Sequence, residues 1–172
     1  MAILPITNAP DARLRVRSSP VETIDDGIRR LADDMLETMY GAPGIGLSAI
    51  QVDIPKQIIV IDLHRDEKPE PIVLINPEIL VRSDETAEFE EGCLSFPTHY
   101  AMVRRFAAVE VRYTDRSGHE KLLAAEGALA TCVQHEMDHL SGVLFVDHIS
   151  RIKRDIILRK LVKTRKLAAA AE

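Results

Sequence analysis

The sequence has few of the features that would set it apart from ordinary globular proteins. It contains only two cysteines, Cys93 and Cys132, which cannot form a disulfide framework. No run of about 18 apolar residues occurs, so no membrane-spanning helix is predicted. The first six residues have neither a basic region nor a long apolar stretch, so we expect no secretory signal and a cytoplasmic location.

An excess of basic residues is also missing. The chain has 22 Lys and Arg against 27 Asp and Glu, a formal net charge of -5. This balance argues against a protein that coats nucleic acid, and we expect no sequence-specific nucleic-acid binding. The 172 residues, 46% hydrophobic and 28% charged, suit one domain with one core and show no internal repeat. We therefore expect a single domain over residues 1–172, with a frayed tail at about 168–172.

Apolar residues recur at helical spacing near both ends of the chain and at strand spacing between them. Ile28, Leu31, Met35 and Met39 predict a helix that begins near Asp25 and ends near Gly41. A second helix is expected from about 126 to 140, stopped by Gly142. A third is expected over about 147–167, with an apolar face that begins with Ile149, Ile152 and Ile156 and then broadens to Ile157, Leu158, Leu161 and Val162. Short strands are predicted at residues 58–61, 72–75, 79–81, 109–113 and 121–123, with a turn at 115–118.

This order of elements lacks the strand-helix-strand alternation of a doubly wound sheet. We therefore expect an α+β fold, with small antiparallel or mixed sheets around a central helix, an N-terminal helix and a C-terminal helix.

The strongest chemical pattern is His135-Glu136-Met137-Asp138-His139, within the second predicted helix. Histidines at i and i+4 lie on one helical face and can bind one metal ion, and the adjacent Glu can hold a water beside it. A catalytic metal also needs a third protein ligand and one open position. Downstream the chain offers His148, in a segment predicted to begin another helix. Upstream it offers Cys93, in a charged stretch that we expect to be irregular, and Cys93 is the better third ligand.

The second cysteine, Cys132, lies one turn before His135 in the same predicted helix, so we expect it to be a pocket wall or core residue. A third segment, Gly44 to Gln51, carries paired glycines that let a backbone approach closely, although such a pair alone more often marks a turn. His64, His99 and His119 fall near predicted turns or strand ends, and we assign them no role.

Three segments together resemble the signature segments of the peptide deformylase family, in the same order and separation. They are Gly44-x-Gly46-Leu47-x-Ala49-x-Gln51, Glu91-Gly92-Cys93-Leu94-Ser95 and Gln134-His135-Glu136-x-Asp138-His139-Leu140-x-Gly142. The N-terminal stretch from Pro10 to Val21 is also similar to that family, so the resemblance covers most of the chain.

The resemblance implies a hydrolase that removes the formyl group from the N-terminal formylmethionine of new polypeptides and releases formate. It makes Cys93, His135 and His139 the metal ligands and Glu136 the general base and acid. It also implies that Gln51 and the backbone N–H of Leu94 stabilise the oxyanion. The implied substrate-binding residues, which form the methionine pocket and pair with the peptide backbone, are Gly44, Ile45, Gly46, Phe89, Gly92, Thr131 and Cys132.

A site of one cysteine and two histidines suits zinc or iron by ligand type. The resemblance favours Fe(II) in the cell, with Zn(II), Ni(II) or Co(II) able to occupy the same site. Two departures from the family pattern are Ser48, in place of a second Ala and expected to affect local packing alone, and Tyr100, where some relatives carry Arg. We also expect Glu91 to pair with Arg105 and so orient the Cys93 loop.

Residues Arg151 to Lys166 include eight Lys or Arg against one acid, Asp155. Because the implied substrate emerges from the ribosome, a contact between this basic helix and ribosomal RNA is a hypothesis. Two rival functions remain open. A zincin-like metallopeptidase would cleave internal peptide bonds without needing Cys93. A non-catalytic binding module with a structural metal would saturate all four coordination positions and leave Glu136 dispensable.

Overall fold

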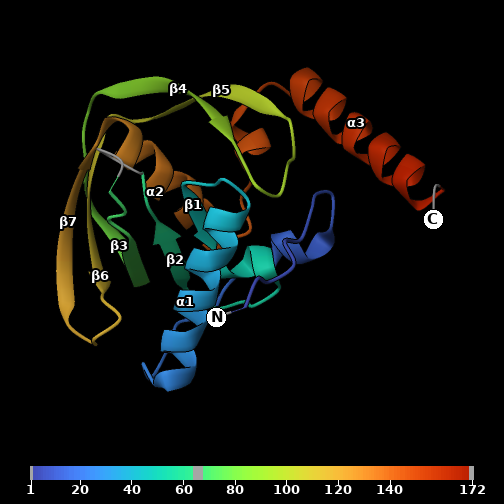
Figure 1. Cartoon of the computed structure of the whole chain (residues 1–172). Helices are drawn as coiled ribbons and strands as arrows, with labels where there is room; N and C mark the ends of the chain where they lie inside the picture. The colour runs from blue at the N-terminus through green and yellow to red at the C-terminus, as the bar shows by residue number, and fades with distance from the viewer. Residues whose placement is uncertain (1, 64–67, 171–172) are drawn as a thin grey trace.

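The computed structural model describes residues 2–63 and 68–170, and within them the chain forms two antiparallel sheets and three α-helices (Figure 1). The larger sheet has the order β1-β2-β3-β6-β7, and β4 pairs with β5 in a separate two-stranded sheet. The α+β class expected from the order of elements is confirmed. The strands are β1 (Gly46–Ser48), β2 (Ile58–Ile61), β3 (Ile72–Arg82), β4 (Thr86–Gly92), β5 (Tyr100–Phe106), β6 (Ala108–Thr114) and β7 (Glu120–Glu126).

Strand β2 lies at the centre of the core and is buried along its whole length. Ile58 and Val60 pack in the cluster that holds the apolar face of α1 (Asp26–Gly41). Ile59 and Ile61 point to the other face and pack with α2 (Gly127–Leu140). Successive side chains of a strand point to opposite faces, so the unbroken run of β-branched residues is explained by one helix on each side of the sheet.

Helix α1 begins and ends where its sequence predicts. The Asp25 side chain accepts a hydrogen bond from the backbone N–H of Ile28 at 2.9 Å, which satisfies one of the free donors of the first turn. Helix α2 also agrees with the prediction to within one residue. Gly142, just beyond α2, has a φ of +72°, and a Cβ there would lie 2.4 Å from the carbonyl oxygen of Arg15. Only glycine fits that position without strain.

The sheets differ from the prediction in two places. Residues 72–82 form one strand and not two, with a register shift between Ile75 and Glu78 where Asn76 and Pro77 interrupt the pairing. Strands β4 and β5 were not predicted, because their alternating pattern is filled largely by charged residues. The exposed face of β4 carries Glu88 and Glu90, whereas that of β5 carries Tyr100, Met102 and Phe106 beside Arg104. The inward face of β4 carries Phe89 and Glu91. The stretch before Cys93 is therefore a strand, and only the segment from Cys93 onward is irregular.

The C-terminal segment also differs from its prediction. A short 3-10 helix, η4 (Phe145–His148), comes first, and α3 (Arg151–Ala169) begins only after Ser150. The buried residues of α3 are Ile157 and Leu161, whereas Ile152 is 74% exposed. The expected apolar face is therefore wrong for Ile152 and Ile156, which are exposed. It is right for Ile157, Leu158 and Leu161, which pack in the cluster that joins α3 to the rest of the structure. The expected fraying from 168 is also too early, since α3 continues to Ala169, and residues 171–172 lie outside the described residues.

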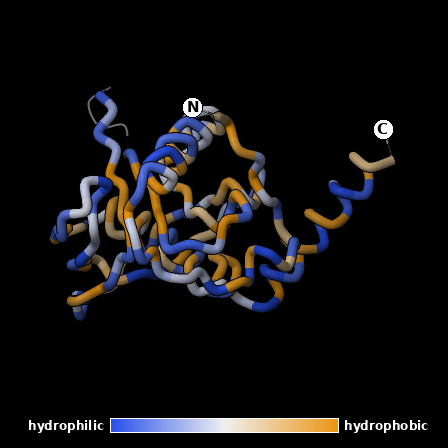
Figure 2. Tube along the Cα trace, turned by 90° about the horizontal axis from the view of Figure 1, so that it is seen from below, coloured by the Kyte–Doolittle hydropathy of each residue, from blue (hydrophilic) through white to orange (hydrophobic). Residues whose placement is uncertain are grey.

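Figures 1 and 2 both show α3 extending away from the sheets, so most of its surface is free of the body. A third apolar cluster, which includes Leu14, Phe96 and Phe145, joins the start of α3 to the N-terminal segment. Two further 3-10 helices, η1 (Ala12–Arg15) and η2 (Ala49–Val52), complete the described elements. Among the helices of residues 2–63 and 68–170, none has the length and apolar character that crossing a bilayer requires.

Candidate active site

Helix α2 presents two different faces. One packs against the sheet through residues that include Ala130, Val133 and Leu140. The other carries His135 and His139, four residues apart, whose ring centroids are 5.1 Å apart. Both histidines are buried, so this face of the helix directs its polar side chains into the interior of the protein and not toward solvent.

Cys93, just after β4, meets these two histidines. One candidate ligand atom from each of Cys93, His135 and His139 lies within 4.8 Å of the others, the one such group among the described residues. The Cys93 Sγ is 3.3 Å from Nε2 of His139. A thiolate and two imidazoles at this spacing match the donor set of a zinc or ferrous site. The structure thus brings together the three residues expected to be ligands and leaves His148 outside the group.

His135 is oriented by Glu91. The Nδ1 of His135 lies 2.8 Å from Oε2 of Glu91, which leaves Nε2 to face the ligand cluster. Burial alone lowers the pKa of His135, but hydrogen bonds with Cys93 and Glu91 raise it well above the ordinary value. The same negative surroundings that favour a proton on this ring favour a divalent cation beside it. A carboxylate on the second ring nitrogen is the usual arrangement for a metal-binding histidine.

His139 has a different environment. Burial, followed by the nearby charges of His135 and Arg105, lowers the pKa of His139 well below its ordinary value. Its ring is therefore neutral at physiological pH, which is the form that binds a metal. The Nδ1 of His139 is buried without a hydrogen-bond partner in the described structure.

Glu136 lies beside this cluster and is almost fully buried. Burial raises the pKa of Glu136, while the charge of His135 and a hydrogen bond from Ser48 oppose that rise. The Ser48 hydroxyl lies 2.7 Å from Oε2 of Glu136. A carboxyl group with a raised pKa next to a group of candidate metal ligands has the properties of a general base and acid.

Gln51 directs an N–H group toward the cluster, and Leu94 lies next to it in the chain segment that holds Cys93. Nε2 of Gln51 donates to Sγ of Cys93 at 3.5 Å and to Oγ of Ser95 at 3.1 Å. Its amide oxygen is held in turn by the backbone N–H of Ser48 at 2.9 Å, which fixes the orientation of the amide. Leu94 follows Cys93 directly and lines the same cavity.

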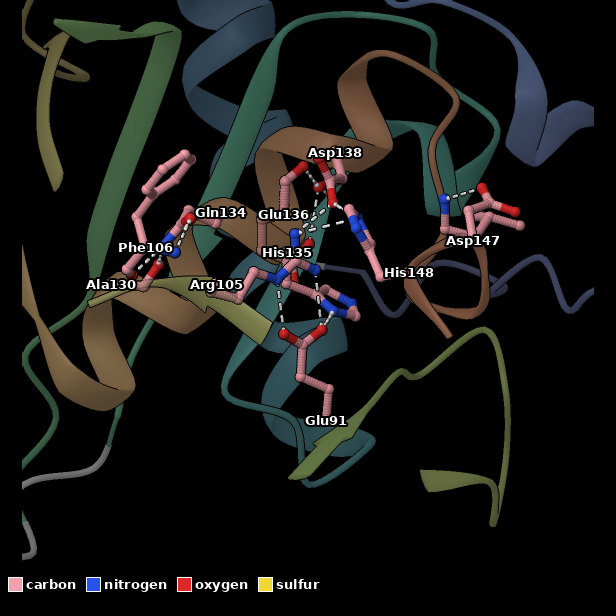
Figure 3. A network of polar contacts seen from close by, with 12 residues as sticks. Glu91, Arg105, Phe106, Ala130, Gln134, His135, Glu136, Asp138, Asp147 and His148 are labelled. Carbon is pink, nitrogen blue, oxygen red and sulfur yellow. Dashed lines mark hydrogen bonds and ion pairs between the residues drawn. The ribbon is translucent and has the colours of Figure 1, made fainter. Parts of the chain in front are cut away.

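A network of polar contacts extends behind His135, buried at Glu91 and Arg105 and partly exposed at Asp138 and His148 (Figure 3). Arg105 donates to Oε1 of Glu91 at 2.7 Å and to Oε2 at 3.0 Å, which confirms the expected pairing. Burial raises the pKa of Glu91, but the hydrogen bonds from Arg105 and His135 lower it to about 2. Arg105 also donates to Asp138 at 2.5 Å, and Asp138 contacts His148 at 2.7 Å. His148 is therefore part of this network behind the ligand cluster.

A cavity of about 650 Å³ opens in front of the ligands. All seven residues expected to bind the substrate line it, and so do Cys93, Leu94, His135 and Glu136. Its wall also includes Phe96, Tyr100 and His99. His99, assigned no role from the sequence, lies at this wall with Nδ1 bound to the Pro97 carbonyl. His119 is exposed as expected, and His64 lies outside the described residues.

Gly46 is required by close packing. A Cβ at Gly46 would lie 2.6 Å from Oε1 of Glu136 and 2.9 Å from Sγ of Cys132. Burial and the carboxylate of Glu136 raise the pKa of the Cys132 thiol well above its ordinary value, so it stays protonated. Cys132 is thus a wall residue, as expected, and the glycine backbone lies directly against the groups of α2.

Three residues of the site were not predicted. Ser48 bonds to Glu136, whereas the sequence suggests only an effect on local packing. Asp138 and His148 join the Arg105 network. The sequence gives a weak indication for Asp138. A residue three positions after His135 on a helix lies near the same helical face, so its carboxylate is expected close to the site. The sequence gives no indication for Ser48, since its contact depends on how β1 approaches α2.

Comparison with known proteins places the chain among deformylases. The family model described as polypeptide deformylase matches residues 3–155. A peptide deformylase from Rhizobium meliloti is 55% identical over 171 residues, covering 99% of this chain and 98% of that protein. One from Zymomonas mobilis is 52% identical, with 97% of each chain covered.

Solved structures give the same result. A peptide deformylase from Ehrlichia chaffeensis superposes with a TM-score of 0.92 at 38% identity, covering 98% of this chain and 99% of that one. Another, from Synechococcus elongatus in complex with actinonin, superposes with a TM-score of 0.87 at 48% identity, covering 91% and 86%. The arrangement of sheets and helices expected from the sequence is therefore that of this family.

The Glu91 contact predicts a loss of both metal affinity and stability in Glu91→Gln. The amide cannot serve both Arg105 and His135 as a carboxylate does, and it leaves a buried guanidinium short of a counter-charge. We expect metal affinity to fall about 10- to 100-fold and the free energy of unfolding to fall by about 3 kcal/mol. Competition with a chelating dye and urea denaturation measure the two effects.

The matched control is Glu88→Gln. Glu88 pairs with Arg104 on the same hairpin, but the two side chains are 52% and 68% exposed. This change should cost less than about 1 kcal/mol and leave metal affinity unaltered. Equal behaviour of the two variants would show that the Glu91 contact does not orient His135.

Proposed function

We propose how this chain, which belongs to the peptide deformylase family, carries out the family's reaction with its own residues. The enzyme is a metal-dependent hydrolase that removes the formyl group from N-terminal formylmethionine of newly made polypeptides and releases formate. One observation supports the assignment of residues: the cavity ends at a Cys-His-His cluster with a buried carboxyl group beside it.

Cys93, His135 and His139 are the metal ligands in this proposal. Three protein ligands leave a coordination position open for water or substrate, as in catalytic metal sites. When bound, the ion supplies a Lewis acid that polarises the formyl group and makes water more acidic. We propose Fe(II) as the ion in the cell, as the family resemblance implies, with Zn(II), Ni(II) or Co(II) able to occupy the same site. The mixed thiolate and imidazole set suits both iron and zinc.

Glu136 carries the proton. It takes a proton from the attacking water, whose oxygen forms a bond to the formyl carbon, and then delivers that proton to the leaving amine nitrogen as the carbon–nitrogen bond breaks. Its burial keeps bulk water from competing for the proton. Two observations support this role: Glu136 lines the cavity, and its carboxyl group is held by Ser48.

Gln51 and the Leu94 N–H stabilise the negative charge that develops on the formyl oxygen. Within the described structure the Leu94 N–H has no acceptor, and the Gln51 amide is already oriented by Ser48. The methionine side chain fills the apolar part of the cavity, along Phe89, Thr131 and Cys132. The peptide backbone pairs with Ile45, Gly46 and Gly92 at the cavity wall.

The rival functions lack support in the site. A zincin-like metallopeptidase would take its third ligand downstream, but His148 is bound to Asp138 behind the cluster. A structural metal would need a fourth ligand, and the described residues supply a group of three. We also propose that residues 1–172 form one catalytic domain and that it works in the cytoplasm, where a reducing environment preserves the Cys93 thiolate.

The first prediction from this mechanism concerns Glu136→Ala. The variant should release no measurable formate from a formyl-Met peptide while it retains its metal, because the proton carrier is lost and the three ligands are not. Formate release and metal content are measured on anaerobically purified protein. A variant that keeps normal turnover would remove Glu136 from the mechanism, and an inactive wild type loaded with Fe(II) or Ni(II) would refute the proposed function.

A second prediction concerns Gln51→Ala. Loss of one oxyanion donor should lower kcat about 100- to 1,000-fold. Metal content should stay unchanged, because Gln51 is not a ligand. Steady-state kinetics on a formyl-Met peptide measures this change, and near-normal kcat would exclude Gln51 from stabilising the oxyanion.

We further propose that α3 contacts the ribosome. The helix extends from the body (Figure 2), and its basic residues Arg159, Lys160, Lys163 and Lys166 are exposed. Phosphate groups of ribosomal RNA are the chemical partner that such a helix fits. Among the described residues, the buried anchors of this helix are Ile157 and Leu161, with Leu158 partly buried beside them.

Replacing those four basic residues with Gln should therefore weaken ribosome binding and reduce its dependence on salt, with formate release from a short peptide unchanged. Cosedimentation with ribosomes over a salt series measures the binding. The control replaces Lys68 and Lys121, which are exposed away from α3. Identical binding by both variants and the wild type would contradict the proposal.

A further inference from the structure

Ser48 is a fully buried polar residue that the reaction described above does not yet use. It ends strand β1, directly before η2, and has 0% exposure. Its Oγ lies 2.7 Å from Oε2 of Glu136 and 2.8 Å from the backbone carbonyl of the same residue. The hydroxyl has one hydrogen and donates it to one of these oxygens at a time. The contact with Oε2 is the one that can hold the carboxyl group of Glu136.

The two carboxylate oxygens of Glu136 have different surroundings. Oε2 is held by Ser48, whereas no hydrogen bond to Oε1 is found from the rest of the described chain. Oε1 lies instead against the backbone of Gly46, which lines the cavity. One oxygen is therefore anchored, and the other is available on the cavity side.

The backbone and the side chain of Ser48 act on different groups. Its N–H donates to the amide oxygen of Gln51, a contact that any residue at position 48 could make. Its hydroxyl alone contacts Glu136. A substitution of the side chain therefore tests the contact to Glu136 without removing the hydrogen bond that orients Gln51.

We propose that Ser48 is a positioning residue, which holds Oε2 of Glu136 so that Oε1 is the oxygen that exchanges protons with the reacting groups. The inference rests on the proposed role of Glu136 as proton carrier. In that step an O–H bond of the attacking water breaks and an O–H bond to Oε1 forms, and the proton then passes to the amine nitrogen. The Ser48 hydroxyl donates its one hydrogen to Oε2. Because the transferred proton goes to Oε1, Oε2 can accept this hydrogen bond both before and after the transfer, so the anchor persists throughout.

The contact makes a prediction for Ser48→Ala. Without the anchor the carboxyl group can rotate away from the cavity, so kcat should fall by about 10-fold, the effect of losing one hydrogen bond to a charged group. KM should stay within about twofold, because Ser48 does not line the cavity and touches no substrate. Metal content should not change, since Ser48 contacts none of the three ligands.

Two further variants separate positioning from packing. Ser18→Ala removes another buried hydroxyl, one whose oxygen has no hydrogen-bond partner in the described structure, and it should leave kcat unchanged. Ser48→Thr keeps the hydroxyl and should restore kcat to within about threefold of wild type. If the added methyl group unfolds the Thr variant, the comparison of Ser48→Ala with Ser18→Ala is sufficient to separate positioning of Glu136 from a general effect on packing.

A Ser48→Ala enzyme with wild-type kcat, or equal losses in the two Ala variants, would overturn the inference. So would a change confined to KM. Wild-type formate release in the same assay keeps this result distinct from the proposed function, because an active wild type with a neutral Ser48→Ala refutes only the role of Ser48.

Discussion

The buried carboxylate of Glu91 is the group on which the geometry of the site depends. Its side chain is 3% exposed and would be costly to bury alone, and two hydrogen bonds from Arg105 together with one contact to His135 offset that cost. Arg105 is on β5 and His135 on α2, so one carboxylate ties the small sheet to the central helix. Cys93 follows Glu91 by two residues, and this tie therefore also places the thiol opposite the histidines.

Much of this arrangement could be predicted from the sequence, for definite reasons. Two histidines four residues apart on a helix share one face. The apolar spacing of α1 predicts a helix, and the β-branched run of β2 predicts a buried strand. Strands β4 and β5 could not be predicted, because apolar residues do not mark one face of either strand. On β5 the outward positions include Tyr100, Met102 and Phe106, which the sequence pattern does not distinguish from a buried face. The polar inward residues, Glu91 and Arg105, hide the inward face further, since sequence patterns identify a buried face by its apolar residues.

The buried face of the C-terminal helix was predicted only in part, for a different reason. Its apolar residues lie on more than one face, and periodicity does not reveal which of them meets the body. The contact is decided by Phe145 and Leu14, which are distant in sequence and pack with Ile157 and Leu161. Ile152 is left exposed because it points away from this cluster. Tertiary contacts, and not local pattern, select the buried face of such a helix.

The contact between Ser48 and Glu136 shows how the core determines the chemistry. Strand β1 has three residues and holds its place by pairing with β2, in the register Gly46 to Ile61 and Ser48 to Ile59. Because β2 is packed between α1 and α2, the spacing between β1 and α2 is set by the same apolar side chains that fill the core. Gly46 permits the close approach, and Ser48 then meets the carboxyl group of Glu136. A change of volume at Ile59 or Ile61 would therefore move the proton carrier, although neither residue touches the cavity.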